Sequence, residues 1–160
     1  MYEIETRIRI EAPIEVVFDV IADHERFFDG PDQEYCRLTT DGREERNGLG
    51  AVREICAQGM IFSEEITGFE RPTRLEYVVR SLTTRSGRNL PLRHEIGWMQ
   101  FATADEATEV EWRSRFEIPI PMVGKVMEIA AGRWSKAGFL KLLARARKEI
   151  EREVHVAPPA

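Results

Sequence analysis

The hydrophobic pattern of the chain changes period within its first 28 residues. From Tyr2 to Ile10 apolar side chains or threonine alternate with charged ones, which predicts a strand with one buried and one solvated face. Pro13 then marks the start of a helix, because apolar residues follow at helical spacing between Val16 and Ile21. Residues 24–28 predict a second short helical turn. A strand that leads directly into two short helices restricts the folds worth considering.

The rest of the chain predicts hairpins followed by one long helix. Turn signals rich in glycine, proline or charge separate the predicted strands at residues 34–40, 51–57, 60–69, 75–81, 93–102 and 108–118. Residues 123–153 contain no proline and have an apolar stripe, which predicts a helix. This order is typical of an α+β fold, and economical packing lays the long helix across the inner face of a curved antiparallel sheet. Space between the two layers would suit an apolar ligand.

Composition limits the kinds of partner. The 160 residues fit a single domain, which we place at residues 1–155, with 156–160 as a disordered tail. The formal charge of −5 argues against nucleic acid or an anionic membrane as a partner. Cys36 and Cys56 do not have zinc-site spacing, so we interpret them as reduced structural thiols. With no signal peptide or bilayer-length apolar segment, we expect a cytoplasmic protein without an integral membrane segment, and no feature indicates its oligomeric state.

Several segments, taken in order along the chain, carry a family resemblance: residues 8–18 with 21–23, 48–53, 65–72 with 75–77, and 107–112 before the long helix. Together they resemble the START/Bet v 1-like (SRPBCC) superfamily, in particular its polyketide cyclase/dehydrase-like branch. The resemblance implies a helix-grip fold, in which about six or seven antiparallel strands curve around the C-terminal helix. It also implies a small hydrophobic ligand of polyketide-like, aromatic or acyl character, held between sheet and helix.

Charged residues on the predicted strands are candidates for proton transfer and for stabilising a charge on a ligand. They are Arg53, Glu54, Glu64, Glu65 and Arg113. Strand alternation puts only one of Glu64 and Glu65 inside, and apolar residues at 62 and 66 favour Glu64. An inward Glu64 would accept a proton while Arg53 or Tyr77 steadies an oxyanion, and this chemistry needs no cofactor. The alternative is a ladder of salt bridges on the outer face of the sheet.

Histidine offers a second candidate acid or base. The chain has three histidines, and only His94 lies on a predicted strand near the expected cavity mouth. Its ordinary pKa near neutrality suits proton transfer. His24 is expected in a charged surface turn and His155 in the C-terminal tail. The alternative for His94 is a histidine at the rim without a function.

Aromatic and methionine side chains are the expected lining of the ligand site. With Arg53, we expect Phe27, Phe62, Tyr77, Met99, Phe101, Trp112, Met127 and Trp134 to contact the ligand. Within residues 93–102, the set Gly97, Met99 and Phe101 suits the cavity side, because glycine leaves room. Met122, Val123, Val126 and Met127, with Phe27 and Phe28 opposite, would form an adaptable gate.

Three functions remain open at this point. The first is ligand binding with possible cofactor-free cyclase or dehydrase activity through Glu64 or His94. The second is a lipid or quinone carrier with an apolar cavity and no chemistry. The third is an interaction module that binds another protein through the curved sheet or the gate, which a large exposed apolar patch would favour.

Overall fold

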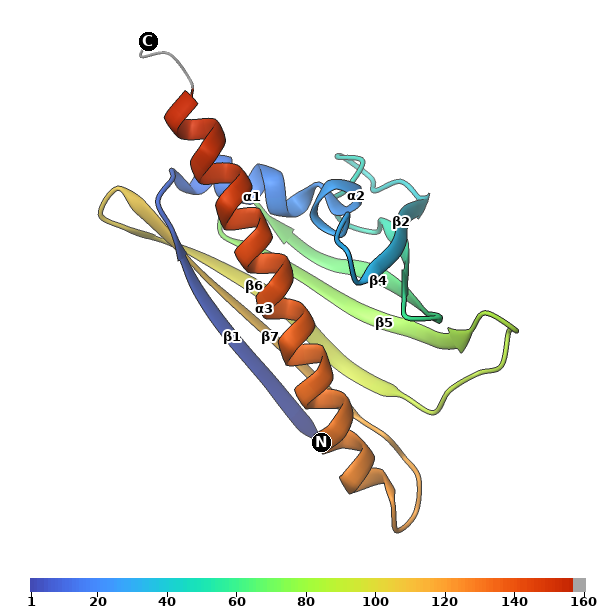
Figure 1. The fold of residues 1–160 in the computed structure, drawn as a ribbon. Helices are drawn as coiled ribbons and strands as arrows, with labels where there is room; N and C mark the ends of the chain where they lie inside the picture. Colours follow the sequence, from blue (N-terminus) through green and yellow to red (C-terminus); the bar gives the residue numbers. More distant parts are fainter. Residues whose placement is uncertain (157–160) are drawn as a thin grey trace.

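The predicted strands form one sheet in the computed structural model, which describes residues 1–156 (Figure 1). The strands are β1 (Tyr2–Ile10), β2 (Gln33–Thr40), β3 (Val52–Ala57), β4 (Met60–Glu70), β5 (Arg74–Thr84), β6 (Arg93–Ala104) and β7 (Ala107–Glu117). All neighbouring strands are antiparallel, in the order β1-β7-β6-β5-β4-β3-β2. Strands β2 to β7 therefore follow one another as hairpins, and β1 pairs with β7 at the far edge. The predicted α+β helix-grip fold is confirmed.

Three helices complete the fold: α1 (Ile14–Ala22), α2 (His24–Phe27) and α3 (Gly124–Val156). α3 crosses the sheet diagonally and packs against β1, β7 and α1 (Figure 1). In its C-terminal half the buried residues are apolar, namely Leu142, Leu143, Ala146 and Ile150. In its first three turns the buried residues are Gly124, Glu128 and Gly132. Only the C-terminal half of α3 therefore closes the hydrophobic core.

Charged contacts hold α2 and the following loop against α3. Arg26 lies 2.7 Å from Glu149 and 2.6 Å from Glu153 of α3. In the opposite direction, Arg145 of α3 donates to the backbone carbonyls of Arg26 and Phe27 at 2.7 and 2.6 Å. Lys141 also forms a 2.7 Å ion pair with the α2–β2 loop. These contacts tie the two helices together on the inner side of the sheet.

The C-terminus differs from the prediction. α3 continues to Val156, so His155 lies in the last helical turn rather than in a tail. An apolar stripe marks only the packed part of a helix, whereas the hydrogen-bonded turns extend beyond it. The remainder of the predicted tail, residues 157–160, lies outside the described residues.

The inner face of β6 is the one favoured by the sequence. Gly97, Met99 and Phe101 are buried, and Gly97 lies opposite Tyr77 of β5. A Cβ atom at position 97 would lie only 2.2 Å from Cζ of the Tyr77 ring. The ring thus occupies the room that glycine leaves.

We expect Gly97→Ala to lower the free energy of unfolding by about 1–3 kcal/mol, because the buried Tyr77 ring has no space to move. Gly138→Ala is the matched control, since a Cβ at that helical position meets nothing within 4 Å. It should stabilise the protein by about 0.5–1 kcal/mol through helix propensity. Urea denaturation of both variants measures the difference, and equal midpoints would contradict the packing argument.

Candidate functional site

A buried ion pair lies at the centre of the inner face. Arg53 of β3 and Glu64 of β4 are direct cross-strand partners. Arg53 Nε donates to Glu64 Oε2 at 2.8 Å, and Nη2 approaches the same oxygen at 2.6 Å. The Arg53 side chain is 1% exposed and that of Glu64 is 9% exposed. Burying such charges is costly unless they are paired and hydrogen-bonded, so this cluster is a specific feature of the site.

His24 completes the cluster and corrects the sequence interpretation. It was expected on the surface, but it is fully buried at the start of α2. Arg53 Nη1 lies 2.7 Å from His24 Nδ1, and His24 Nε2 lies 3.0 Å from the carbonyl of Asn47. Because arginine only donates, Nδ1 accepts and the proton is on Nε2. Burial, and then the Arg53 charge, lower the pKa of His24 well below its ordinary value, so the ring is neutral.

Two aromatic rings enclose the Arg53 guanidinium. Its central carbon lies 4.6 Å from the centroid of the Phe28 ring and 5.2 Å from that of Tyr77. Ring faces attract cations, and the attraction is stronger where water is excluded. The two rings therefore help to offset the loss of hydration and fix the plane of the guanidinium.

A second network of polar side chains lies beside the ion pair. Trp112 Nε1 donates to the Tyr77 hydroxyl at 2.9 Å, and the Tyr77 ring stacks on that of His94. His94 Nδ1 accepts from the Val79 amide at 3.1 Å, so Nε2 bears the proton and donates to Ser114 Oγ at 3.0 Å. Burial lowers the pKa of His94 to about 4 and raises that of Tyr77. Both ring nitrogens of His94 are thus engaged by the protein.

One carboxylate oxygen of Glu64 has no such partner. Arg53 contacts Oε2, and no donor among residues 1–156 is placed to hydrogen-bond Oε1. Oε1 is also absent from the fully enclosed unpaired polar atoms of this part of the chain, so it retains contact with solvent. The fixed carboxylate therefore presents one free acceptor on the inner face of the sheet.

The other charged strand residues lie on the outer face, as the alternative interpretation predicted. Glu54 pairs with Arg37 at 2.7 Å, and Glu65 pairs with Arg80 at 2.8 Å. Arg113 lies 3.2 Å from Glu3 on the neighbouring strand β1. The five charged residues thus divide between an inner ion pair and an outer set of salt bridges.

The predicted lining residues fall into two groups. Phe27, Met99, Phe101 and Trp112 are core residues with 1% exposure. The sequence did not single out Phe139 of α3 as a lining residue. Its ring stacks on that of Trp112, with the ring centroids 3.6 Å apart, and fills the space under the C-terminal half of the helix. The only sequence feature that indicated this packing was the position of Phe139 in the apolar stripe of the helix.

The second group of predicted lining residues remains accessible. Phe62 is half-buried on the inner face, two residues from Glu64. Met127 and Trp134 are 42% and 37% exposed in the N-terminal half of α3. Trp134 lies seven residues before Lys141, on the side of the helix that faces the α2–β2 loop.

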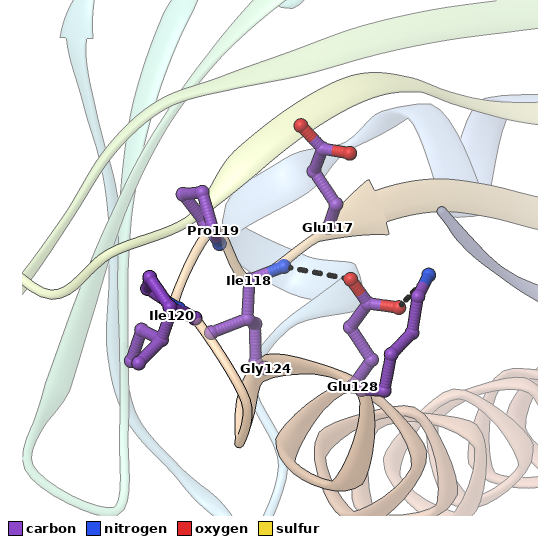
Figure 2. Close-up of a pocket in the computed structure, with 8 residues that line it drawn as sticks. Glu117, Ile118, Pro119, Ile120, Gly124 and Glu128 are labelled. Atoms are coloured by element: carbon purple, nitrogen blue, oxygen red, sulfur yellow. Dashed lines mark hydrogen bonds and ion pairs between the residues drawn. The ribbon is translucent and has the colours of Figure 1, made fainter.

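Two hollows occur at the rim of the molecule. One, of about 400 Å³, lies between α2 and β2 and is lined by Phe28 and Cys36 among others. This hollow borders the cluster of Arg53, Glu64 and His24, since the Phe28 ring covers the Arg53 guanidinium. Burial raises the pKa of the Cys36 thiol to about 12. The other, of about 340 Å³, lies under the β7–α3 connection (Figure 2). The sequence predicted a cavity between the sheet and the long helix; under the C-terminal half of α3, the stacked rings of Phe139 and Trp112 occupy that space.

Comparison with known proteins identifies the family. Residues 1–151 match the family described as polyketide cyclase/dehydrase and lipid transport. The chain belongs to this family. Among curated proteins, no sequence matches it.

Solved structures share the fold at low sequence identity. The Zhui aromatase/cyclase from a Streptomyces species has a TM-score of 0.75 at 16% identity, with 99% of each chain covered. A START superfamily protein from Mycobacterium smegmatis has a TM-score of 0.70 at 12% identity, covering 95% of this chain and 99% of that one. A conserved protein from Geobacillus kaustophilus also has a TM-score of 0.70, at 14% identity, covering 94% of this chain and 96% of that one.

Within residues 1–156, no group of three or more histidine, cysteine, aspartate or glutamate side chains is placed to hold a metal ion. None of the helices in the same residues is long and apolar enough to span a membrane.

The ion pair can be tested by a mutant cycle. Glu64→Gln should destabilise the protein by roughly 3–5 kcal/mol, because it leaves the Arg53 charge buried without its counterion. The single variants Arg53→Met and Glu64→Leu and the double variant Arg53→Met/Glu64→Leu form the cycle, and the double variant should lose less than the two single variants together, since both charges are removed at once. Glu65→Gln, on the outer face of the same strand, is the control and should change stability by less than about 0.5 kcal/mol. Additive losses in urea denaturation would show that the two side chains are not coupled.

The buried neutral state of His24 predicts a pH dependence. Its pKa is lowered in the folded state, so below the ordinary value of 6.5 the unfolded chain binds one more proton. Stability should therefore fall as pH decreases from about 6.5, by up to about 1.4 kcal/mol per pH unit from this group. His24→Gln retains an acceptor and a donor but should reduce this slope. Denaturation midpoints at several pH values measure the slope of stability against pH for wild type, for His24→Gln and for the control His155→Gln. Identical slopes for wild type and His24→Gln would contradict the prediction.

Proposed function

We propose that the protein binds a small hydrophobic ligand, polyketide-like, aromatic or acyl in character, on the inner face of the sheet beside Glu64. The observation that carries this proposal is the free oxygen Oε1 of a carboxylate that Arg53 holds in place. Such an acceptor among apolar side chains favours a ligand that carries a hydroxyl group, because a hydrogen bond to a charged acceptor is stronger than a neutral one. Membership of the polyketide cyclase/dehydrase and lipid transport family supports this ligand class.

The accessible apolar side chains would supply the rest of the contact. Phe62 precedes Glu64 by two residues on β4, Val79 lies opposite Glu64 on β5, and both side chains are half-buried on the inner face. Met127 and Trp134 of α3 would cover the ligand from the helix side, and Phe28 would border its polar end. A ligand in this position replaces water on surfaces that the protein itself leaves partly uncovered.

A second candidate function is cofactor-free proton transfer at the same carboxylate. Because Arg53 occupies Oε2, Oε1 is oriented to accept a proton from a ligand hydroxyl or from carbon next to a carbonyl. His94 would then act as a positioning residue. Both of its ring nitrogens are hydrogen-bonded to the protein, so it would hold the Ser114 hydroxyl and the stacked Tyr77 ring in place and would not itself exchange a proton with the ligand. The fold similarity to an aromatase/cyclase makes this chemistry worth testing.

Two aromatic probes test the hydroxyl preference. We expect 2-naphthol to bind wild type about tenfold or more tightly than 2-methoxynaphthalene, which cannot donate to Oε1. The variant Arg53→Met/Glu64→Leu removes the acceptor without leaving a buried cation, and it should abolish the preference. Isothermal titration of both probes measures this, with Glu65→Gln as the control.

Two results would count against the proposed site. Equal affinities of the two probes in wild type and in the double variant would favour an apolar carrier without a polar contact at Glu64. Failure of both probes to bind, together with native mass spectra free of any co-purifying small molecule, would contradict ligand binding itself.

A further inference from the structure

The connection from β7 to α3 and the first turns of α3 expose an unusual number of apolar side chains. We call residues 118–136 the α3 tip. Six of the eleven large exposed apolar residues within residues 1–156 belong to it, namely Met122, Val123, Val126, Met127, Ile129 and Trp134. Met122 is fully exposed and Val126 is 70% exposed. The fold itself leaves this surface uncovered, because the α3 tip lies beyond the part of α3 that closes the core.

The base of the α3 tip is firmly built. Glu128 is 4% exposed and accepts from the Ile118 amide and from Lys125 Nζ, each at 3.1 Å (Figure 2). The Gly124 amide donates to the Ile120 carbonyl at 2.9 Å, and a Cβ at Gly124 would lie 2.2 Å from the Ile118 carbonyl oxygen. Two prolines within residues 118–121 restrict the backbone further. The exposed apolar side chains are therefore held outward in advance, so binding through them orders little additional chain.

The charges of the α3 tip differ in sign from those of the whole chain. Residues 117–140 contain two carboxylates, of which Glu117 pairs with Arg93 and Glu128 is buried. Lys125, Arg133 and Lys136 are exposed there. The net charge of −5, which argued against an anionic membrane, therefore resides elsewhere on the molecule.

The order of these residues along α3 suits a lipid surface. Arg133 follows Ile129 by four residues and Lys136 follows it by seven, so both cations share a helix face with an exposed apolar residue. Long cationic side chains reach phosphate groups while neighbouring apolar side chains enter the acyl boundary. A second copy of the chain would instead bring like charges together at the same surface.

We propose that the α3 tip docks the protein reversibly on an anionic lipid surface. Met122, Val123 and Val126 enter the boundary between headgroups and acyl chains, and Arg133 and Lys136 contact lipid phosphates. This inference rests on the exposed tip alone and does not depend on the ligand proposed for the inner face.

Sedimentation with vesicles tests the docking. The full chain should bind phosphatidylcholine vesicles that contain phosphatidylserine about tenfold or more tightly than vesicles of phosphatidylcholine alone, and added salt should weaken the binding. Met122→Ser/Val126→Ser and Arg133→Gln/Lys136→Gln should each reduce binding by about tenfold or more.

Matched controls separate the α3 tip from general effects. Leu49→Ser removes an apolar side chain of 43% exposure from the β2–β3 loop, and Arg147→Gln/Arg152→Gln removes two exposed cations from the other half of α3. Both should bind vesicles like wild type. Circular dichroism confirms that each variant folds.

A tryptophan on the docking face gives a direct readout of the geometry. Brominated lipids in anionic vesicles should quench Ile129→Trp/Trp134→Phe more strongly than Trp134→Phe alone, because position 129 shares a helix face with Arg133 and Lys136, whereas Trp134 lies on the side toward the α2–β2 loop. Equal vesicle binding by tip variants and controls would overturn the proposal. So would a lack of vesicle binding accompanied by a concentration-dependent mass in light scattering, which would identify a second copy as the occupant.

Discussion

The buried charge of Arg53 is the constraint on which the arrangement of the inner face depends. A guanidinium does not lose its proton in a protein, so burial obliges the fold to surround it with acceptors and ring faces. Glu64 supplies a carboxylate from the neighbouring strand, His24 supplies a ring nitrogen from α2, and Phe28 and Tyr77 enclose the plane. One cation thereby fixes how α2 and the strands β3 to β5 meet.

Local patterns predicted most of the fold. The change of period between Tyr2 and Phe28 located β1 and the two short helices, and turn signals located the hairpins. The inward direction of Glu64 also followed from a local feature, because residues 62 and 66 on the same strand are apolar. Each of these predictions needed only neighbours within a few positions along the chain.

The features that sequence did not predict depend on distant partners. His24 lies in a charged segment and looks exposed, yet its acceptor role depends on Arg53, 29 residues away. Its position three residues before buried Phe27, on the same helix face, was the only local hint. The stacking of Phe139 on Trp112 is similarly non-local, and it fills part of the space between sheet and helix in which a cavity was expected.

The long helix shows why an apolar stripe alone is ambiguous. The stripe runs through both halves of α3, but only the C-terminal half buries large apolar side chains against the sheet, whereas the buried residues of the N-terminal half are Gly124, Glu128 and Gly132. The charges beside the stripe distinguish the halves. In the C-terminal half, Glu149 and Glu153 bind Arg26 of the same molecule, so the helix is matched to its own protein. In the α3 tip the exposed charges are all cationic, and within residues 1–156 neither Arg133 nor Lys136 forms an ion pair, which leaves both free for the external anionic partner that we propose.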